Sequence, residues 1–396
     1  MLTMFFGEKL QAVRELKGLS RKELADLVNV SEQAIWQYEN GYTVPKFEII
    51  NEFKQIFFVK PQFFYTESFI KNIATIERIA YRAEDREARK KAKMETTYLN
   101  FISHFILAFE ANVEEPPKII YQLRQASEVY YYGASKTTDK KMIIQHLAEK
   151  ARIELNIKNN KELLYKFEMS GISILEKNMG AEIDAYSVWT KENRPFIILG
   201  NRKKSSVRRN FDLAHELGHL LMHRLIDMDS LSKEEHKVIE KEANDFASYF
   251  LLPEQEFIND FKQIKKKSNP YSYVELKMKY MVSIIALEYR AYKLDLLSFE
   301  ENRYFYASLN KYNMRQKEPL DEDIPIVQPG KIRALLHFVF DNQLLLLSDF
   351  LDKYNIELSF LANLLSVDED FLTKFNDTVR TDYYHSNIIP FSPNRK

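Results

Sequence analysis

The segment "FDLAHELGHLLMHR", residues 211–224, places three histidines and a glutamate among apolar residues. On an α-helix His215 and His219, which are four residues apart, lie on one face about 40° from each other. Two imidazoles at this spacing can hold one Zn²⁺, and Glu216 between them can reach a water on the metal. A buried histidine pair with a chance glutamate is the alternative. Because a buried ionisable group costs free energy unless something compensates it, the pattern favours a hydrolytic metal site.

The third ligand must come from elsewhere, because a catalytic zinc takes three protein ligands and a water. A helix predicted for residues 232–252 offers several candidates. Glu240 and Asn244, four residues apart, share one side of it and would supply a ligand and a hydrogen-bonding group behind it. Glu242 is about 200° from Glu240 and is expected to point away. Helical periodicity alone does not separate Glu240 from His236, which is also one turn away.

The composition narrows both the chemistry of the site and the class of protein. Among 396 residues there is no cysteine, so any metal must be held by His, Asp or Glu. Lys and Arg total 57, as do Asp and Glu, and this balance points to no particular partner. No run of about 18 apolar residues appears, and the first residues lack the pattern of a secretory signal. We therefore predict a cytoplasmic protein with no membrane partner.

Local signals predict short helices near the N-terminus and a sheet before the histidine helix. Ser20 followed by Glu23 is a capping-box pattern, Ser31 is a second N-cap and Gly41 is a C-terminal stop. Two short helices joined by about three or four residues make a helix-turn-helix. The β-rich runs "GISILEK", "AYSVWT" and "RPFIILG" predict a small sheet.

Two stretches, "FDLAHELGHLLMH" and "IEKEANDFASYFLLP", resemble the ImmA/IrrE family of metallopeptidases. The resemblance covers residues 145–300 and implies a zincin-like domain whose antiparallel sheet precedes the active helix. It implies three metal ligands and a general base, which are His215, His219, Glu240 and Glu216 in that order. His223, one turn beyond the second ligand, would stabilise an oxyanion or hold the fold.

Residues 7–64 resemble a Cro/repressor-like (Xre-type) helix-turn-helix, through "LSRKELADLVNVSEQAIWQYENGYTVPKFEIINEF". The resemblance implies that the helix beginning at Ser31 enters the major groove of operator DNA. Base contacts are expected from Ser31, Glu32, Gln33 and Gln37, and phosphate contacts from Arg21 and Lys22. Residues 1–66 hold eight basic and eight acidic residues, however, so a helical domain that mediates protein contacts is the alternative.

The expected fold is therefore mostly α with a small antiparallel sheet (α+β), in four parts. These are a helix-turn-helix domain (1–66), a helical connector (67–144), a metallopeptidase domain (145–300) and a helical C-terminal region (301–396). Residues 344–372 have helical periodicity and a weak likeness to a helix-turn-helix, and we expect them to pack on the peptidase domain. No internal repeat is apparent. The basic loop 202–209 is either solvated surface or the border of a peptide cleft.

Together these patterns predict a DNA-binding, zinc-dependent endopeptidase of a bacterial or phage regulatory system, with Mn²⁺ as the alternative ion. Its protein substrate would be a helix-turn-helix repressor, because members of the family that the chain resembles cleave such proteins. One alternative is a transcription regulator whose metal site is not catalytic. Another is a toxin–antitoxin or mobile-element immunity component that acts by protein contact.

Overall fold

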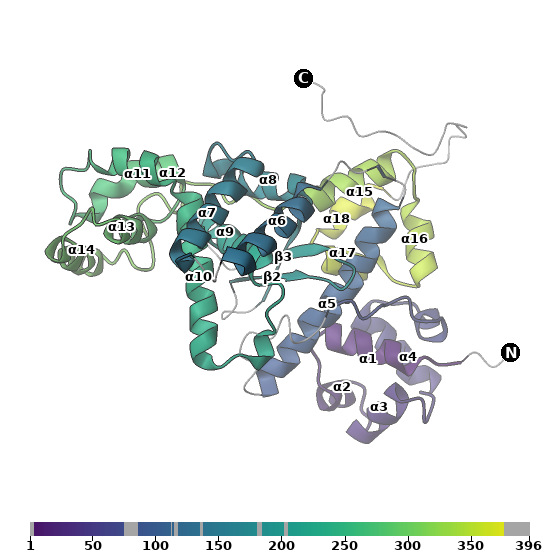
Figure 1. The fold of residues 1–396 in the computed structure, drawn as a ribbon. Coiled ribbons are helices and arrows are strands. Elements are labelled where there is room, and N and C mark those ends of the chain that lie inside the picture. The colour runs from purple at the N-terminus through teal and green to yellow at the C-terminus, as the bar shows by residue number, and fades with distance from the viewer. Residues whose placement is uncertain are drawn as a thin grey trace. The chain divides into compact units, whose positions relative to one another are not determined.

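The computed structural model describes residues 4–74, 86–111, 113–114, 118–134, 138–179, 184–201 and 205–375 (Figure 1). The chain divides into two compact units. Unit 1 comprises residues 1–116, 190–192 and 330–396, and unit 2 comprises residues 117–189 and 193–329. Within the described ranges, every helix is too short or too polar to span a lipid bilayer. Residues 202–204 of the basic loop and the chain beyond 375 lie outside the described residues.

Unit 1 begins with the predicted helix-turn-helix. Four helices, α1 (Gly7–Leu16), α2 (Arg21–Leu27), α3 (Glu32–Glu39) and α4 (Phe47–Phe57), lead to a short 3₁₀ helix, η1 (Pro61–Tyr65). The capping box at the start of α2 is present, because Ser20 Oγ accepts from the Glu23 backbone and the Glu23 carboxylate accepts from the Ser20 N–H. Ser31 caps α3 in the same way through the Ala34 N–H. The local expectations for this segment are therefore confirmed.

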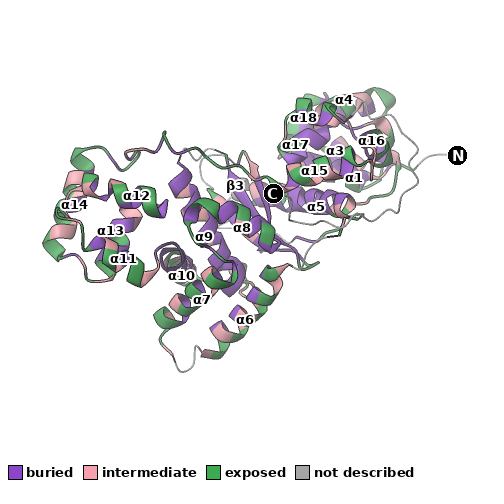
Figure 2. Cartoon of the chain, turned by 90° about the horizontal axis from the view of Figure 1, so that it is seen from above, coloured by how far each residue is buried: buried purple, intermediate pink, exposed green. Residues whose placement is uncertain are grey.

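The rest of unit 1 corrects one expectation. The long helix α5 (Arg86–Glu110) packs with the C-terminal helices α15 (Lys331–Asp341), α16 (Leu347–Tyr354) and α17 (Leu358–Leu365), and α18 (Glu369–Thr373) packs with α17 (Figure 2). Ring centroids are 5.2 Å apart for Phe105 and Phe350 and 5.6 Å apart for Phe101 and Phe360. These aromatic contacts bury the C-terminal helices in the same unit as the helix-turn-helix. The expectation that they pack on the peptidase domain was wrong.

Unit 2 surrounds a small sheet with helices. Three helices, α6 (Ile119–Ala134), α7 (Lys140–Glu154) and α8 (Leu163–Ser170), precede the strands β1 (Ser173–Lys177), β2 (Ala185–Trp189) and β3 (Pro195–Gly200). The helices that follow are α9 (Ser206–Met222), α10 (Lys233–Leu251), α11 (Glu254–Phe261), α12 (Val274–Tyr280), α13 (Ile284–Lys293) and α14 (Phe299–Lys311). The predicted mostly helical fold with one small sheet is confirmed.

The sheet is mixed rather than antiparallel. Its order is β1-β3-β2, with β3 antiparallel to β2 and parallel to β1. All six residues of β3 are buried, and a strand covered on both sides reads as a continuous apolar run and takes a central place. Since β2 and β3 form the antiparallel pair, β1 lies on the other edge. The apolar pattern predicts these strands but not their directions.

Close packing of α9 on α10 places the two motif helices side by side. Gly218 faces Phe246, and a Cβ added there would lie 3.1 Å from the Phe246 Cδ1 atom. The absence of a side chain therefore lets the helices approach closely. Leu213, Leu217 and Phe246 are almost fully buried in this contact region. The helix pair is thus a rigid base for polar residues on its other faces.

Candidate metal centre

The helix α9 and its C-cap residue place three histidines in one row. His215, His219 and His223 follow at intervals of four residues, and successive ring centroids are 4.7 and 5.0 Å apart. Burial increases along the row, since the side chains are 15, 9 and 1% exposed. Burial and the two flanking histidines hold the pKa of His219 well below its ordinary value. The central ring is therefore neutral, which is the form that binds a metal ion.

Glu240 of α10 completes a group of three possible ligands. Its carboxylate oxygens lie 3.6 Å from His215 Nε2 and 3.3 Å from His219 Nε2, and the two Nε2 atoms are 3.0 Å apart. All three ligand atoms lie within 4.8 Å of one another. In the described residues, this group contains neither His236 nor Glu216. The geometry thus favours Glu240 over His236 and leaves Glu216 beside the cluster.

Hydrogen bonds behind the two rings direct their lone pairs into the cluster. His215 Nδ1 lies 3.0 Å from the Asn244 Oδ1 atom, which can only accept, so Nδ1 carries the proton and Nε2 is bare. His219 Nδ1 lies 2.9 Å from His223 Nδ1. If His219 donates in this pair, its Nε2 is bare as well. Two bare nitrogens and a carboxylate then face one another at close range.

These groups fit a divalent cation. Glu240 Oε1 is buried without a hydrogen-bond partner, and burial raises the pKa of the Glu240 carboxyl to about 7. A bound cation would compensate both the repulsion between the lone pairs and the desolvation of the carboxylate. Two imidazole nitrogens and one carboxylate oxygen form a donor set known from catalytic zinc sites. Zn²⁺ and Mn²⁺ both accept these ligands.

A second carboxylate supports the row from its far end. Glu242 Oε2 lies 3.2 Å from His223 Nε2 and accepts a hydrogen bond from the Tyr131 hydroxyl of α6. Lys140 Nζ of α7 is 3.6 Å from the other Glu242 oxygen. Burial alone would raise the pKa of Glu242, but hydrogen bonds from His223 and Tyr131 outweigh it and the pKa is lowered. Glu242 is therefore an anion that accepts from His223.

This arrangement corrects the helix-face argument for Glu242. Its side chain was expected to point away from the site, yet it contacts the last histidine of the same row that Glu240 approaches. The helix angle does separate the two carboxylates, but α9 is long enough to meet both. The support from Tyr131 and Lys140 is not visible in the sequence, since these residues come from helices about 100 residues upstream of Glu242. No local pattern could have found them.

Two arginines of the basic loop, Arg208 and Arg209, anchor the start of α9 to other segments of unit 2. Arg209 donates to Glu176 of β1 at 2.9 Å and to the Val327 carbonyl at 3.1 Å. Arg208 donates to the carbonyls of Arg315 and Gln316. Both arginines thus have a structural role, because they bind the start of α9 to β1 and to the segment 315–327. The other basic residues of the loop, 202–204, lie outside the described residues.

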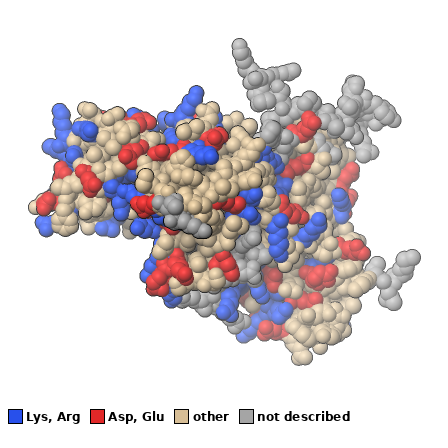
Figure 3. Space-filling view, in the orientation of Figure 1, with Lys and Arg blue, Asp and Glu red and all other residues tan. Residues whose placement is uncertain are grey.

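Unit 1 exposes most of the residues expected to contact DNA. Lys22, Ser31, Glu32 and Gln33 are exposed, and Gln37 is half-buried. Arg21 instead binds the buried carboxylate of Glu39, 2.6 Å from its Nε. Figure 3 shows acidic and basic side chains interspersed, with no uniform basic face in this view.

Sequence reasoning missed an aromatic pair beside these residues. Trp36 of α3 is 41% exposed, and its ring stacks on that of Tyr42 with the centroids 5.1 Å apart. On the helix, Trp36 lies about 60° from Gln33 and about 40° from Asn40, so it belongs to the same exposed face. The signal available in the sequence was a tryptophan on the helix that was expected to read DNA.

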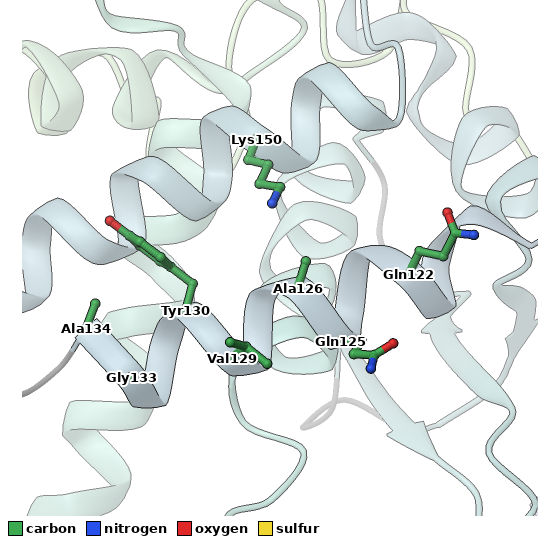
Figure 4. A pocket seen from close by; sticks show the side chains of 8 residues that line it. All are labelled: Gln122, Gln125, Ala126, Val129, Tyr130, Gly133, Ala134 and Lys150. Carbon is green, nitrogen blue, oxygen red and sulfur yellow. The ribbon is translucent and has the colours of Figure 1, made fainter.

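A hollow on the surface lies between α6 and α7 (Figure 4). Its volume is about 640 Å³, and it is lined by Gln122, Gln125, Ala126, Val129, Tyr130, Gly133, Ala134 and Lys150. None of these residues belongs to the group of possible metal ligands. The metal cluster is therefore a separate feature.

Comparison with known families agrees with the division of the chain into a helix-turn-helix unit and a unit with the metal cluster. Residues 167–292 match the family model of the IrrE N-terminal-like domain, a peptidase family. Unit 2 carries an IrrE-like domain. The match spans the sheet, α9 and α10, and therefore His215, His219 and Glu240. Residues 10–64 match a helix-turn-helix family, so the expected fusion of a DNA-binding module with a metallopeptidase-type domain is confirmed. No curated protein matches the sequence.

Proposed function

We propose that this chain is a DNA-binding, zinc-dependent endopeptidase that cleaves a repressor protein in the cytoplasm of a bacterium or in a phage-controlled system. The observation that carries the proposal is the convergence of His215, His219 and Glu240 in the IrrE-like domain, with one ligand atom of each lying within 4.8 Å of the others. A helix-turn-helix in the same chain supports an operator as the second partner.

The proposed chemistry is peptide hydrolysis by general-base catalysis. A divalent cation held by the three ligands would polarise the scissile carbonyl and acidify water. Glu216 is adjacent to His215 and outside the donor group, and its carboxylate is proposed to accept a proton from the attacking water. The same carboxyl then gives that proton to the nitrogen of the leaving amine. This sequence of transfers uses one residue as base and then as acid.

Asn244 and His223 are proposed to position the ligands rather than to react. Asn244 accepts from His215 Nδ1, and His223 accepts from His219 Nδ1 while it donates to Glu242. Each contact fixes the ring orientation and leaves Nε2 for the metal. The oxyanion role considered for His223 is disfavoured, because its side chain is 1% exposed and both nitrogens have partners.

The decisive experiment uses the purified full-length chain with repressors encoded next to its gene. With Zn²⁺ or Mn²⁺ added, the wild type should cut one of them into two defined fragments. Glu216→Gln should keep the metal and the fold but cleave at least about 10²-fold more slowly, since a general base contributes roughly 10²–10⁴-fold.

Glu234→Gln on the exposed first turn of α10 is the matched control and should cleave at the wild-type rate. If Glu216→Gln cuts a confirmed substrate as fast as the wild type, the mechanism fails. If the metal is bound but the wild type cleaves none of the repressors, the site is a non-catalytic one in a transcription regulator.

A further inference from the structure

The C-terminal helices of unit 1 repeat the backbone geometry of the N-terminal helix-turn-helix. In the first module the N-cap Ser20 is followed nine residues later by Asn29 at φ 51° and eleven residues later by the N-cap Ser31. In the second module the N-cap Glu357 is followed at the same distances by Ser366 at φ 52° and by the N-cap Asp368. The two turns therefore have the same length and the same left-handed residue.

Hydrogen bonds around the two turns agree residue for residue, at a constant offset of 337 positions. Val30 donates to the Ala25 carbonyl at 3.0 Å, and Val367 donates to the Ala362 carbonyl at 3.0 Å. Before the turn helix, Leu19 donates to the Arg14 carbonyl at 3.0 Å, and Ile356 donates to the Leu351 carbonyl at 3.1 Å. The agreement covers the end of the preceding helix as well as the turn.

The buried positions correspond over the same span. Core residues of the first module are Leu10, Val13, Leu24, Ala25, Val28 and Ile35. Their counterparts at the same offset are Leu347, Phe350, Leu361, Ala362, Leu365 and Leu372, and all of these are buried too. Residues 347–373 thus form a second helix-turn-helix. The sequence suggested no internal repeat, because only Leu10, Leu24 and Ala25 among these core positions keep the same residue type.

The second module has only one basic residue that could neutralise a phosphate backbone. All four basic residues of segment 10–35 are replaced at the equivalent positions, where Leu351, Tyr354, Leu358 and Ser359 stand. Segment 347–372 holds one lysine and six acidic residues, three of them at 368–370 around the start of α18. Since DNA affinity depends on phosphate neutralisation, the excess of acidic residues in this segment disfavours DNA binding.

The second module is instead joined to the first. Val59, which follows α4, forms an antiparallel bridge with Ile356, and both side chains are fully buried. The Lys60 N–H donates to the Asn355 carbonyl at 2.8 Å, and the Glu357 N–H donates to the Phe58 carbonyl at 2.9 Å. Lys60 also pairs with Asp352. The turn before α17 is thus hydrogen-bonded directly to the DNA-binding module.

We propose that residues 347–373 are a second helix-turn-helix that makes no DNA contact and acts as the built-in partner of the first. Helix-turn-helix modules read operators in pairs, with two reading helices in successive half-sites. Here one chain carries one reading helix, α3, and its own partner covers the segment after α4. This inference rests on the DNA-binding part of the proposed function, and it predicts an asymmetric site bound by one chain.

The first test needs no DNA. This test measures amide hydrogen exchange in the full chain. Ile356→Ala should accelerate exchange in α1–α4 and in α16–α18 together, by at least about tenfold. The reason is that a large-to-small change at a buried site destabilises the packed unit. The milder Ile356→Val should give about two- to tenfold and serves if the alanine variant does not fold. Val327→Ala, exposed in unit 2, is the control and should leave both segments unchanged. Faster exchange in α16–α18 with wild-type protection in α1–α4 would overturn the partnership.

The second test selects sites from a random duplex library with the full-length chain. The expected result is a motif without an inverted repeat, with one chain per duplex by sedimentation. Lys22→Glu should lower affinity for the selected site, whereas Glu369→Lys should leave it unchanged within about twofold. A palindromic motif with two chains, or a change of more than about fivefold in Glu369→Lys, would contradict the inference. If no duplex is bound at all, the DNA-binding proposal fails, while the exchange experiment still decides whether the two modules are partners.

Discussion

Removing the Glu242 charge should weaken metal binding without touching a ligand. Glu242 accepts from His223, which in turn contacts His219. A hydrogen bond to a charged group is worth about 1.5–3 kcal/mol, against about 0.5–1.5 kcal/mol for a neutral pair. Glu242→Gln should therefore weaken the hydrogen bond that orients the His223 ring by about 1–1.5 kcal/mol. We expect Zn²⁺ affinity to fall by about tenfold, since 1.4 kcal/mol corresponds to a factor of ten.

Complete removal of the acceptor should have a larger effect. Glu242→Ala leaves His223 Nε2 and the Tyr131 hydroxyl without their carboxylate, and loss of such a supporting group costs about 10- to 100-fold in metal affinity. Tyr131→Phe keeps the contact between the carboxylate and His223, and should cost less than Glu242→Gln. Glu240→Ala removes a ligand and should abolish binding.

Competition with a chromophoric chelator measures these affinities, and circular dichroism checks the fold of each variant. Glu234→Gln, on the exposed first turn of the same helix, is the matched control. If folded Glu242→Ala binds Zn²⁺ within twofold of the wild type, the orienting role is refuted. If it loses the metal while Glu240→Ala keeps it, the proposed donor group itself is wrong.

Three further predictions concern stability and DNA. Gly7→Ala places a Cβ 2.2 Å from a backbone oxygen and should lower the thermal midpoint of unit 1, whereas Gly133→Ala, with nothing within 4 Å, should not. In the metal-free chain the pKa of Glu240 is about 7, against 4.5 for an ordinary glutamate. The protonated carboxyl therefore contributes to the free energy of unfolding at low pH, and this contribution is lost as pH rises through 7. Urea unfolding from pH 4 to 8 should therefore show the stability of the wild type falling by about 3 kcal/mol relative to Glu240→Gln. Gln33→Ala should relax base preference with an unchanged salt slope, as binding to a mutated site series would show.

Local sequence signals were sufficient for the helix-turn-helix and for the helix that carries the first two metal ligands. The capping box at Ser20 and the cap at Ser31 depend on residues three positions apart, so the sequence determines them without tertiary context. The spacing of His215 and His219 likewise fixes their common helix face. The choice of Glu240 over His236 needed the resemblance or the structure, because both residues satisfy the same helical period.

Contacts between distant segments could not be read in this way. The parallel pairing of β1 with β3 depends on how the chain crosses the sheet, and the apolar pattern of each strand contains no direction. Tyr131 and Lys140 reach Glu242 from other helices. The second helix-turn-helix shares turn geometry with the first but few side chains, so its likeness is visible mainly in backbone angles and burial. Its packing in unit 1 could not be predicted from the sequence either, because it depends on aromatic contacts with the distant helix α5.

The most direct test of the central claim is the metal content of the folded chain. Native mass spectrometry after exposure to Zn²⁺ and removal of the excess should find one ion per wild-type chain. His215→Ala should retain its fold and carry no ion, because one of three ligands is missing and the remaining pair cannot hold the metal through dialysis. Full occupancy in folded His215→Ala would contradict the assignment of the metal centre.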